Sequence, residues 1–363
     1  MSKIWNLLNF KTNSEYDFKK LIDYQLREKS YPQNSNVHII CDIDKTYLET
    51  ELDSIFHMAR VAFESANDKI TVSGASEFLL AARWGENNGE ESRVYPRNLH
   101  FVSSSPPQLR SVLERKLTMD GLDWNSETFK NQAYNVKQRR FNMLKHHIGY
   151  KTAAILSLIK KSQSGSKFYL IGDNSESDAY IYLGIALRLR NKLTVKSFQK
   201  YLEVAGVSSA VASEISETFL DLPKASVEAI LIRCAPNYES TSYPRLTDGI
   251  RHFDNYLQAA FIFIQHQLIP EELLFPLCKT FHNNFWFQRS QIINHLNSFL
   301  KSATTPDIKE VILEVTKQFS KIDTTMPSET ISANLSPCDF SYLDDLQEDE
   351  CLGLAKEWLS NSH

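Results

Sequence analysis

The stretch that decides the fold is residues 37–46, which read VHIICDIDKT. Its first five residues form a short apolar run that ends abruptly at Asp42. A short apolar run bounded by polar residues is typical of a buried parallel strand that meets its loop. The sequence therefore predicts that two carboxylates, Asp42 and Asp44, stand at the end of a buried strand.

Two carboxylates this close repel each other unless a cation lies between them. Mg²⁺ suits such a position, because it is bound by a few carboxylates together with phosphate oxygens and water. Taken alone, the pair Asp42 and Asp44 also fits a solvent-exposed Asp-x-Asp turn. The choice between the two interpretations depends on what the rest of the chain brings to the same place.

Three further apolar runs lie at residues 99–102, 168–171 and 229–232. Segments with the apolar spacing of helices lie between them, for example at 109–117 and 154–159. Strands that alternate with helices predict an α/β domain with a doubly wound, Rossmann-like parallel sheet. Such a sheet binds its ligands at the carboxyl ends of the strands, so functional residues are expected there.

Polar side chains follow two more of these predicted strands. The run at 168–171 continues as Gly-Asp, with Asp173 and then Asp178 five residues later, and Gly172 allows a tight turn between them. Three consecutive serines that begin at Ser103 follow the run at 99–102, and Lys151 opens the helix before the run at 168–171. If the strands are neighbours, Asp173 lies beside the first carboxylate pair and supplies a further metal ligand.

These four elements, in this order, resemble the motifs of the haloacid dehalogenase superfamily of Mg²⁺-dependent phosphohydrolases, over about residues 36–182. Segments 101–106 and 172–182 are more narrowly similar to the actin-patch-type phosphatidate phosphatase catalytic domain. The chain departs from that family's pattern at three positions: Ser104 replaces a glycine, Ala179 a proline and Lys45 an acidic residue. The resemblance implies the fold and the reaction, and it leaves the lipid substrate open.

The resemblance implies that Asp42 attacks phosphorus and forms an aspartyl-phosphate. It implies that Asp44 first protonates the leaving oxygen and then deprotonates the hydrolytic water. Mg²⁺ would be held by the carboxylates of Asp42 and Asp173 and by the backbone carbonyl of Asp44. Asp178 would orient Lys151 or a metal-bound water.

The same resemblance implies that Ser103 and Lys151 hold the phosphoryl oxygens. Ser103 is the first polar residue after its strand, and Ser104 is the second candidate for substrate binding. Lys145 is an alternative to Lys151. Thr46 would fix the geometry of the phosphate-binding loop.

The pattern along the chain predicts three parts. Residues 1–35 are expected to form a helical lead-in, and residues 36–244 a haloacid-dehalogenase-like phosphatase domain with a helical insertion at about 183–223. Residues 245–363 are expected to form a helical module with an acidic tail. The modest spacing between the motifs predicts no large cap, and hence an open site that admits a bulky substrate.

Composition narrows the class of protein. The 363 residues carry a formal net charge of −4, which argues against a dedicated nucleic-acid binder. The five cysteines are scattered, with no Cys-x-x-Cys pair, which suits a reducing compartment. No apolar stretch is long enough for a signal peptide core or a transmembrane helix. We therefore expect a cytoplasmic protein, free or peripheral to membranes, and its oligomeric state stays open.

Positive charge is concentrated in one stretch. From Thr128 to Gly172 there are nine lysines and arginines and no acidic residue. This stretch predicts either an anionic substrate or membrane surface, or a solvated helix face. Within it, Arg139 and Arg140 are the candidates for distal substrate contacts.

Two functions from different classes remain at this point. The first is a Mg²⁺-dependent phosphomonoester hydrolase that acts on a phosphatidate-like lipid or another bulky phosphorylated substrate. The second is a non-catalytic binding or scaffold protein on the same fold. A scaffold has no physical reason to crowd three carboxylates around a metal site, which favours the hydrolase.

Overall fold

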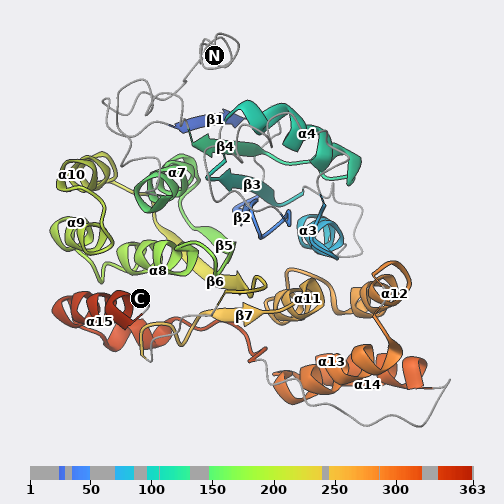
Figure 1. The fold of residues 1–363 in the computed structure, drawn as a ribbon. Helices are drawn as coiled ribbons and strands as arrows, with labels where there is room; N and C mark the ends of the chain where they lie inside the picture. Colours follow the sequence, from blue (N-terminus) through green and yellow to red (C-terminus); the bar gives the residue numbers. More distant parts are fainter. Residues whose placement is uncertain are drawn as a thin grey trace.

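A mixed sheet lies at the centre of the structure, a computed structural model that describes residues 24–28, 35–49, 70–85, 96–105, 107–130, 147–238, 245–285, 287–320 and 334–361 (Figure 1). Its strands are β1 (Tyr24–Glu28), β2 (Val37–Asp42), β3 (Asn98–Ser103), β4 (Ser126–Lys130), β5 (Ser166–Asp173), β6 (Ala225–Arg233) and β7 (Arg251–Phe253). They are ordered β1-β4-β3-β2-β5-β6-β7. The strands β2 to β7 are parallel, whereas β1 pairs with β4 in the antiparallel direction.

The order of the strands in the sheet indicates where a ligand site is expected. Numbered along the chain, the six parallel strands run 3-2-1-4-5-6 across the sheet, the order of doubly wound dinucleotide-binding folds. The order reverses between β2 and β5, which pair directly. Ligands bind outside the carboxyl ends of the strands at this switch point. Asp42 ends β2 and Asp173 ends β5, so both acidic motifs lie there.

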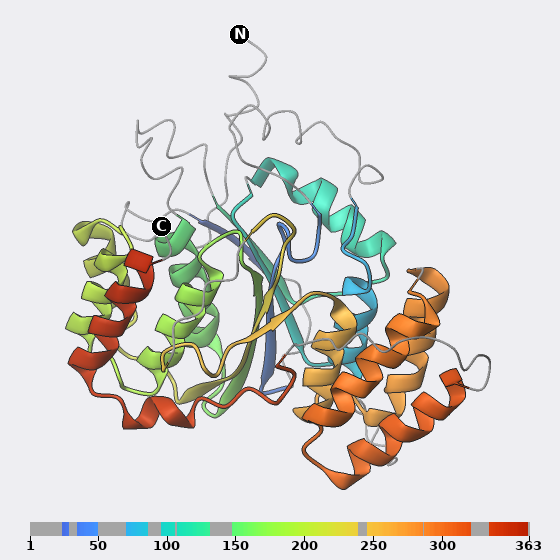
Figure 2. The ribbon, with the colours of Figure 1, turned by 60° about the horizontal axis from the view of Figure 1, so that its bottom comes forward.

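Helices cover both faces of the sheet (Figures 1 and 2). Those in the described residues are α3 (Ala75–Trp84), α4 (Arg110–Met119), α7 (His147–Lys161), α8 (Asp178–Leu189), α9 (Val195–Val204), α10 (Ser209–Thr218), α11 (Tyr256–Gln265), α12 (Leu274–Asn284), α13 (Arg289–Ser302), α14 (Pro306–Ser320) and α15 (Glu348–Asn361). α7 and α8 lie on one face, with α9 and α10 outside them, and α3 and α11 lie on the other. The predicted doubly wound α/β fold is therefore confirmed.

The core follows from the apolar strands. Ile39, Ile40 and Cys41 of β2 are fully buried, as are Leu170 and Ile171 of β5. Strands that are apolar at consecutive positions require cover on both faces, because their side chains alternate between the faces. The helices on either side supply that cover. Among the described residues, no helix combines the length and the apolar character needed to cross a bilayer.

The helical lead-in predicted for residues 1–35 is wrong at residues 24–28, which form β1 at the edge of the sheet. There the backbone forms its hydrogen bonds in a ladder with β4 rather than within a helix. The apolar residues at 4–10 that suggested a helix lie outside the described residues. The lead-in is therefore, in its described part, an additional edge strand.

The module predicted from residue 245 is not helical throughout. It begins with β7, which extends the sheet beyond β6, so the proposed domain boundary crosses the sheet. Its helices α11 to α14 lie on one side of the sheet, whereas α15 lies on the other side, against α9 (Figure 2). A strand of three residues has too little apolar pattern to be recognised from sequence.

The acidic tail is docked through specific contacts. Arg190 Nη1 donates to both carboxylate oxygens of Asp344, at 2.9 and 3.0 Å. Trp358 of α15 is buried, and its ring centroid lies 5.5 Å from that of Tyr180 in α8. The tail therefore contacts α8, which lies on the sheet, and the outer helix α9, and it adds to the apolar packing on that side of the sheet.

Two buried histidines lie side by side on β2 and β3. His38 Nδ1 lies 3.1 Å from His100 Nε2, and His100 Nδ1 lies 2.7 Å from Ser126 Oγ. The His38 ring also stacks on Phe168, with centroids 4.7 Å apart. Burial lowers the pKa of His38 to about 4 and lowers the pKa of His100 well below its usual value. Both imidazoles are therefore neutral in the folded protein at neutral pH.

This pair predicts a loss of stability in mild acid. The unfolded chain binds protons at the two histidines near pH 6.5, whereas the folded protein binds them only at lower pH. Between about pH 7.5 and about pH 5.5 each histidine should lower the free energy of unfolding by about 1.3 kcal/mol. Urea unfolding at both pH values checks this. In the double variant His38→Gln/His100→Gln the difference between the two pH values should shrink by the sum of both contributions, and an unchanged difference would contradict the assignment.

Candidate active site

The chain reverses direction directly after Asp42. The backbone amides of Tyr47 and Leu48 both donate to the carbonyl of Ile43, at 2.9 and 2.8 Å. Lys45 has a φ of +58°, which is uncommon for a residue with a Cβ. Arg233 at the end of β6 donates to the Lys45 carbonyl oxygen at 2.6 Å. Arg233, two strands away in the sheet, thus helps to hold the turn in a conformation that its sequence does not favour.

The serine loop after β3 orients Asp44. The hydroxyls of Ser103 and Ser105 both donate to Asp44 Oδ2, at 2.9 and 2.7 Å. The Ser103 hydroxyl also accepts the Ser105 amide at 3.0 Å, and Tyr150 of α7 donates to the Ser103 carbonyl at 2.7 Å. Asp44, Ser103 and Ser105 are all buried. The Asp44 carboxyl group is therefore held in one orientation at the strand ends.

Thr46 connects this turn to the second acidic motif. Its hydroxyl donates to Asp173 Oδ2 at 3.2 Å, and its carbonyl accepts the hydroxyl of Tyr256 in α11 at 2.8 Å. The other carboxylate oxygen of Asp173 accepts the Ser175 amide at 2.6 Å. Asp173 is fully buried. Thr46 thus has a positioning contact with the predicted metal ligand Asp173.

Lys151 lies among three carboxylates. Its Nζ is 2.9 Å from Asp42 Oδ1, 2.6 Å from Asp178 Oδ1 and 2.7 Å from Glu176 Oε2. The lysine side chain is 1% exposed. Burial disfavours the ammonium ion, but the three carboxylates outweigh burial and raise the pKa of Lys151 well above its ordinary value. The site therefore contains a permanent buried cation.

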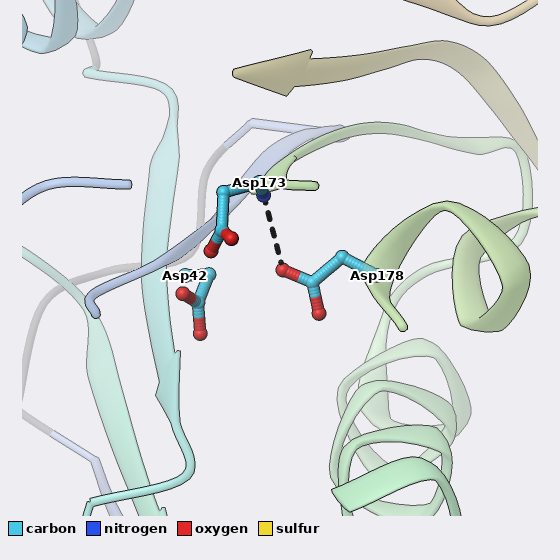
Figure 3. A group of neighbouring side chains, drawn as sticks. All are labelled: Asp42, Asp173 and Asp178. Atoms are coloured by element: carbon cyan, nitrogen blue, oxygen red, sulfur yellow. Dashed lines mark hydrogen bonds between the residues drawn. The ribbon is translucent and has the colours of Figure 1, made fainter. Parts of the chain in front are cut away.

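Glycine is required beside this cluster. A Cβ on Gly172 would lie 2.3 Å from Asp178 Oδ2, well inside van der Waals contact. The same Asp178 oxygen accepts the backbone amide of Asp173 at 3.3 Å (Figure 3). The close approach of Asp178 to β5 is thus possible only because residue 172 has no side chain.

Asp42, Asp173 and Asp178 form a group suited to a divalent cation. One carboxylate oxygen from each lies within 4.8 Å of the others (Figure 3). The Asp42 carboxylate is buried and accepts no hydrogen bond from the described residues, although it pairs with Lys151. A buried carboxylate oxygen without a donor, such as Asp42 Oδ2, costs free energy that a hard cation would recover. The donor set therefore fits Mg²⁺. The sequence predicted that Asp178 only orients Lys151 or a metal-bound water, whereas in the structure its carboxylate belongs to the same group as Asp42 and Asp173.

Burial, reinforced by the charges of neighbouring carboxylates, raises the pKa values of the three aspartates. Burial raises the pKa of Asp42 well above its usual value, opposed by Lys151 and reinforced by Asp178. Burial also raises the pKa of Asp173, and it raises that of Asp178 to about 7. Glu176 differs: burial opposes its ionisation, but the charges of Lys151 and His147 lower its pKa to about 2. A bound cation would relieve the repulsion among the three aspartates.

The structure does not describe every predicted residue. Arg139, Arg140 and the alternative lysine Lys145 lie outside the described residues. Two charged residues that the sequence did not single out are present instead. Glu176 lies inside the quoted Gly-Asp motif, and Lys130, buried at the end of β4, has a pKa that burial lowers to about 8. The sequence identified Lys130 only as one residue of the basic stretch. It did not predict a strand there, because β4 has no apolar run.

A buried lysine, a serine loop and clustered aspartates lie together at the switch point of a Rossmann-like sheet, where ligands of such folds bind. Comparison with known proteins agrees. Residues 37–195 match the family described as phosphatidate phosphatase APP1, catalytic domain. This match confirms the resemblance to that family and supports a phosphatase rather than a scaffold.

One curated relative is an uncharacterized protein of Schizosaccharomyces pombe, 26% identical over 171 residues. The matched region covers 46% of this chain and 26% of the relative. The part of the chain that matches thus spans about a quarter of the length of that protein. No solved structure gives a significant match.

The aspartate cluster predicts a metal-dependent change in stability. With Mg²⁺ at about ten times its Kd, the wild-type protein should gain about 1.4 kcal/mol in its free energy of unfolding. Asp173→Asn should lose this gain, and in EDTA it should be at least as stable as the wild type, because one repulsive charge is removed. Thermal unfolding with Mg²⁺ and with EDTA measures both effects. The exposed Asp221→Asn serves as control and should keep the Mg²⁺ gain; a gain that persists in Asp173→Asn would contradict the metal site.

Proposed function

We propose that the protein is a Mg²⁺-dependent phosphomonoester hydrolase of the haloacid dehalogenase type that works through an aspartyl-phosphate. The observation that carries this proposal is the contact between Lys151 and Asp42, flanked by Asp173 and Asp178, at the strand ends. A candidate nucleophile, a buried cation and a group of aspartates suited to a divalent cation lie together there, which supports this chemistry. The match to a phosphatase catalytic domain supports the same class of reaction.

Asp42 is the proposed nucleophile. Its Oδ1 is paired with Lys151 at 2.9 Å, whereas its Oδ2 has no donor among the described residues, so attack through Oδ2 does not require this ion pair to break. The bond from Asp42 to phosphorus forms as the bond to the leaving oxygen breaks, and water then hydrolyses the acyl phosphate. Mg²⁺ held by Asp42, Asp173 and Asp178 would offset the repulsion between the carboxylate and the phosphate dianion.

Asp44 is the proposed general acid and base. Ser103 and Ser105 donate to one oxygen of its carboxyl group and so fix its direction. A carboxyl group held in a fixed orientation, two residues after the nucleophile, can protonate the leaving oxygen in the first step and accept a proton from water in the second. A leaving alkoxide needs this proton, which favours a phosphatase over a dehalogenase.

Ser104 and Lys151 are the proposed contacts for the phosphoryl oxygens. The sequence favoured Ser103 for this role, but the Ser103 hydroxyl is engaged with Asp44. The Ser104 hydroxyl instead donates to Glu176 Oε2. Lys151 contacts the same oxygen atom, so Ser104 and Lys151 face a common point. We therefore assign phosphate binding to Ser104 and the orientation of Asp44 to Ser103.

The proposed substrate is a phosphatidate-like lipid or another bulky phosphomonoester. The catalytic-domain family is described as a phosphatidate phosphatase. Within the basic stretch, Lys130 and Lys151 are buried, so these two lysines are not available to an anionic surface and the proposal of a lipid surface rests on the other basic residues. Phosphatidate presented in mixed micelles, compared with soluble sugar and nucleotide monophosphates, distinguishes a lipid from a soluble substrate.

Hydrolysis of p-nitrophenyl phosphate tests the reaction. Turnover should require Mg²⁺ and stop in EDTA, and Asp42→Asn should lower kcat by at least about a thousandfold, because the amide cannot form the acyl phosphate. Asp221→Asn should retain full activity. Metal-independent turnover, or turnover that survives in Asp42→Asn, would contradict the mechanism.

The proposed distal contacts have a separate test. Charge reversal in Arg139→Glu/Arg140→Glu should lower kcat/KM on phosphatidate micelles by about tenfold or more, through loss of attraction to the anionic surface. The matched control is Lys160→Glu/Lys161→Glu, the same charge change at the end of α7 that lies away from the active site. Equal effects of the two double variants would show that only net charge matters.

A further inference from the structure

One oxygen atom of Glu176 contacts both groups that we assign to the phosphoryl oxygens. Glu176 Oε2 is 2.7 Å from Lys151 Nζ and accepts a hydrogen bond of 3.1 Å from Ser104 Oγ. An ammonium ion and a hydroxyl recognise a carboxylate oxygen and a phosphate oxygen through the same contacts. The Glu176 carboxylate therefore lies where an oxygen of a bound phosphoryl group is expected.

Of the three carboxylates around Lys151, that of Glu176 is the most exposed and the most able to move away from the lysine. Asp42 is 1% exposed at a strand end and Asp178 is fully buried at the start of α8, whereas the Glu176 side chain is 20% exposed. Glutamate also has one more rotatable bond than aspartate. Of the three, Glu176 is the one that can rotate toward solvent without uncovering the core.

The backbone around Glu176 is anchored independently of its side chain. In the turn between β5 and α8, the Asn174 side chain donates to the Tyr238 carbonyl at 3.0 Å and accepts the Ala235 amide at 2.7 Å. The Ser175 amide donates to Asp173 at 2.6 Å. Moving the Glu176 carboxylate out of the site therefore requires side-chain rotation, which is fast, and no rearrangement of the turn.

A phosphoryl group and the Glu176 carboxylate cannot share this position, because two anions about 3 Å apart repel strongly. We propose that Glu176 is an internal competitor of the phosphoryl group: its carboxylate holds Ser104 and Lys151 and rotates away when phosphate binds. The identity of the substrate in this inference rests on the proposed function. Glu176 would then set the affinity for phosphate and the KM, because each binding event breaks one ion pair and one hydrogen bond.

Binding of inorganic phosphate to the full chain, measured by calorimetry in the presence of Mg²⁺, tests this role. Glu176→Gln keeps the shape of the side chain and removes its charge, so its Kd for phosphate should fall by about ten- to a hundredfold. The KM for p-nitrophenyl phosphate should fall in parallel. Glu203→Gln on α9 makes the same charge change where Glu203 contacts Gln199, and it should bind phosphate like the wild type.

Glu176→Ala, which cannot re-form either contact, should show the same direction and replaces the first variant if that variant does not fold. Phosphate binding that is unchanged or weaker in both variants would overturn the proposal, since Glu176 would then serve to position Lys151. Absence of phosphate binding in the wild type and in both variants would also overturn it. Tighter binding without any turnover would support the competitor role and contradict the proposed hydrolase.

Discussion

The buried charge of Lys151 is the constraint on which the site depends. An ammonium ion with 1% exposure is tolerated only if carboxylates surround it, and here they come from β2, from α8 and from the turn between β5 and α8. The carboxylates in turn would repel one another without the lysine. Because Lys151 belongs to α7, this mutual dependence ties a helix on one face of the sheet to the strand ends at the switch point.

The strands that sequence could identify are those with continuous apolar runs. Four strands carry buried apolar side chains at consecutive positions, and each was expected from this pattern: β2, β3, β5 and β6. β4 reads SETFK and was missed, because it has no apolar run. Its buried carboxylate, Glu127, is satisfied by Trp124 just before the strand, at 2.5 Å, and by Arg110 of α4, at 3.2 Å. Such pairing is decided by tertiary structure, and an edge strand such as β1 depends on β4 for its position.

The site could be predicted where it depends on strand ends, and less well where it depends on turns. Asp42 and Asp173 come together because parallel neighbouring strands end at the same edge of the sheet. The sequence could not predict which of the three serines contacts which carboxylate. The turn after β3 directs Ser103 toward Asp44 and Ser104 toward Glu176. The position of Glu176 follows from the anchored turn after β5, which no spacing rule describes.

The central claim of this account is that Asp42 itself carries the phosphoryl group during turnover. The most direct measurement is to quench the protein in acid during hydrolysis of a phosphomonoester, reduce it with borohydride and analyse the peptides by mass spectrometry. Reduction of an acyl phosphate converts aspartate to homoserine, so the account predicts homoserine at position 42 and at no other aspartate of the site. Homoserine at Asp44, or none at all while product is released, would contradict it.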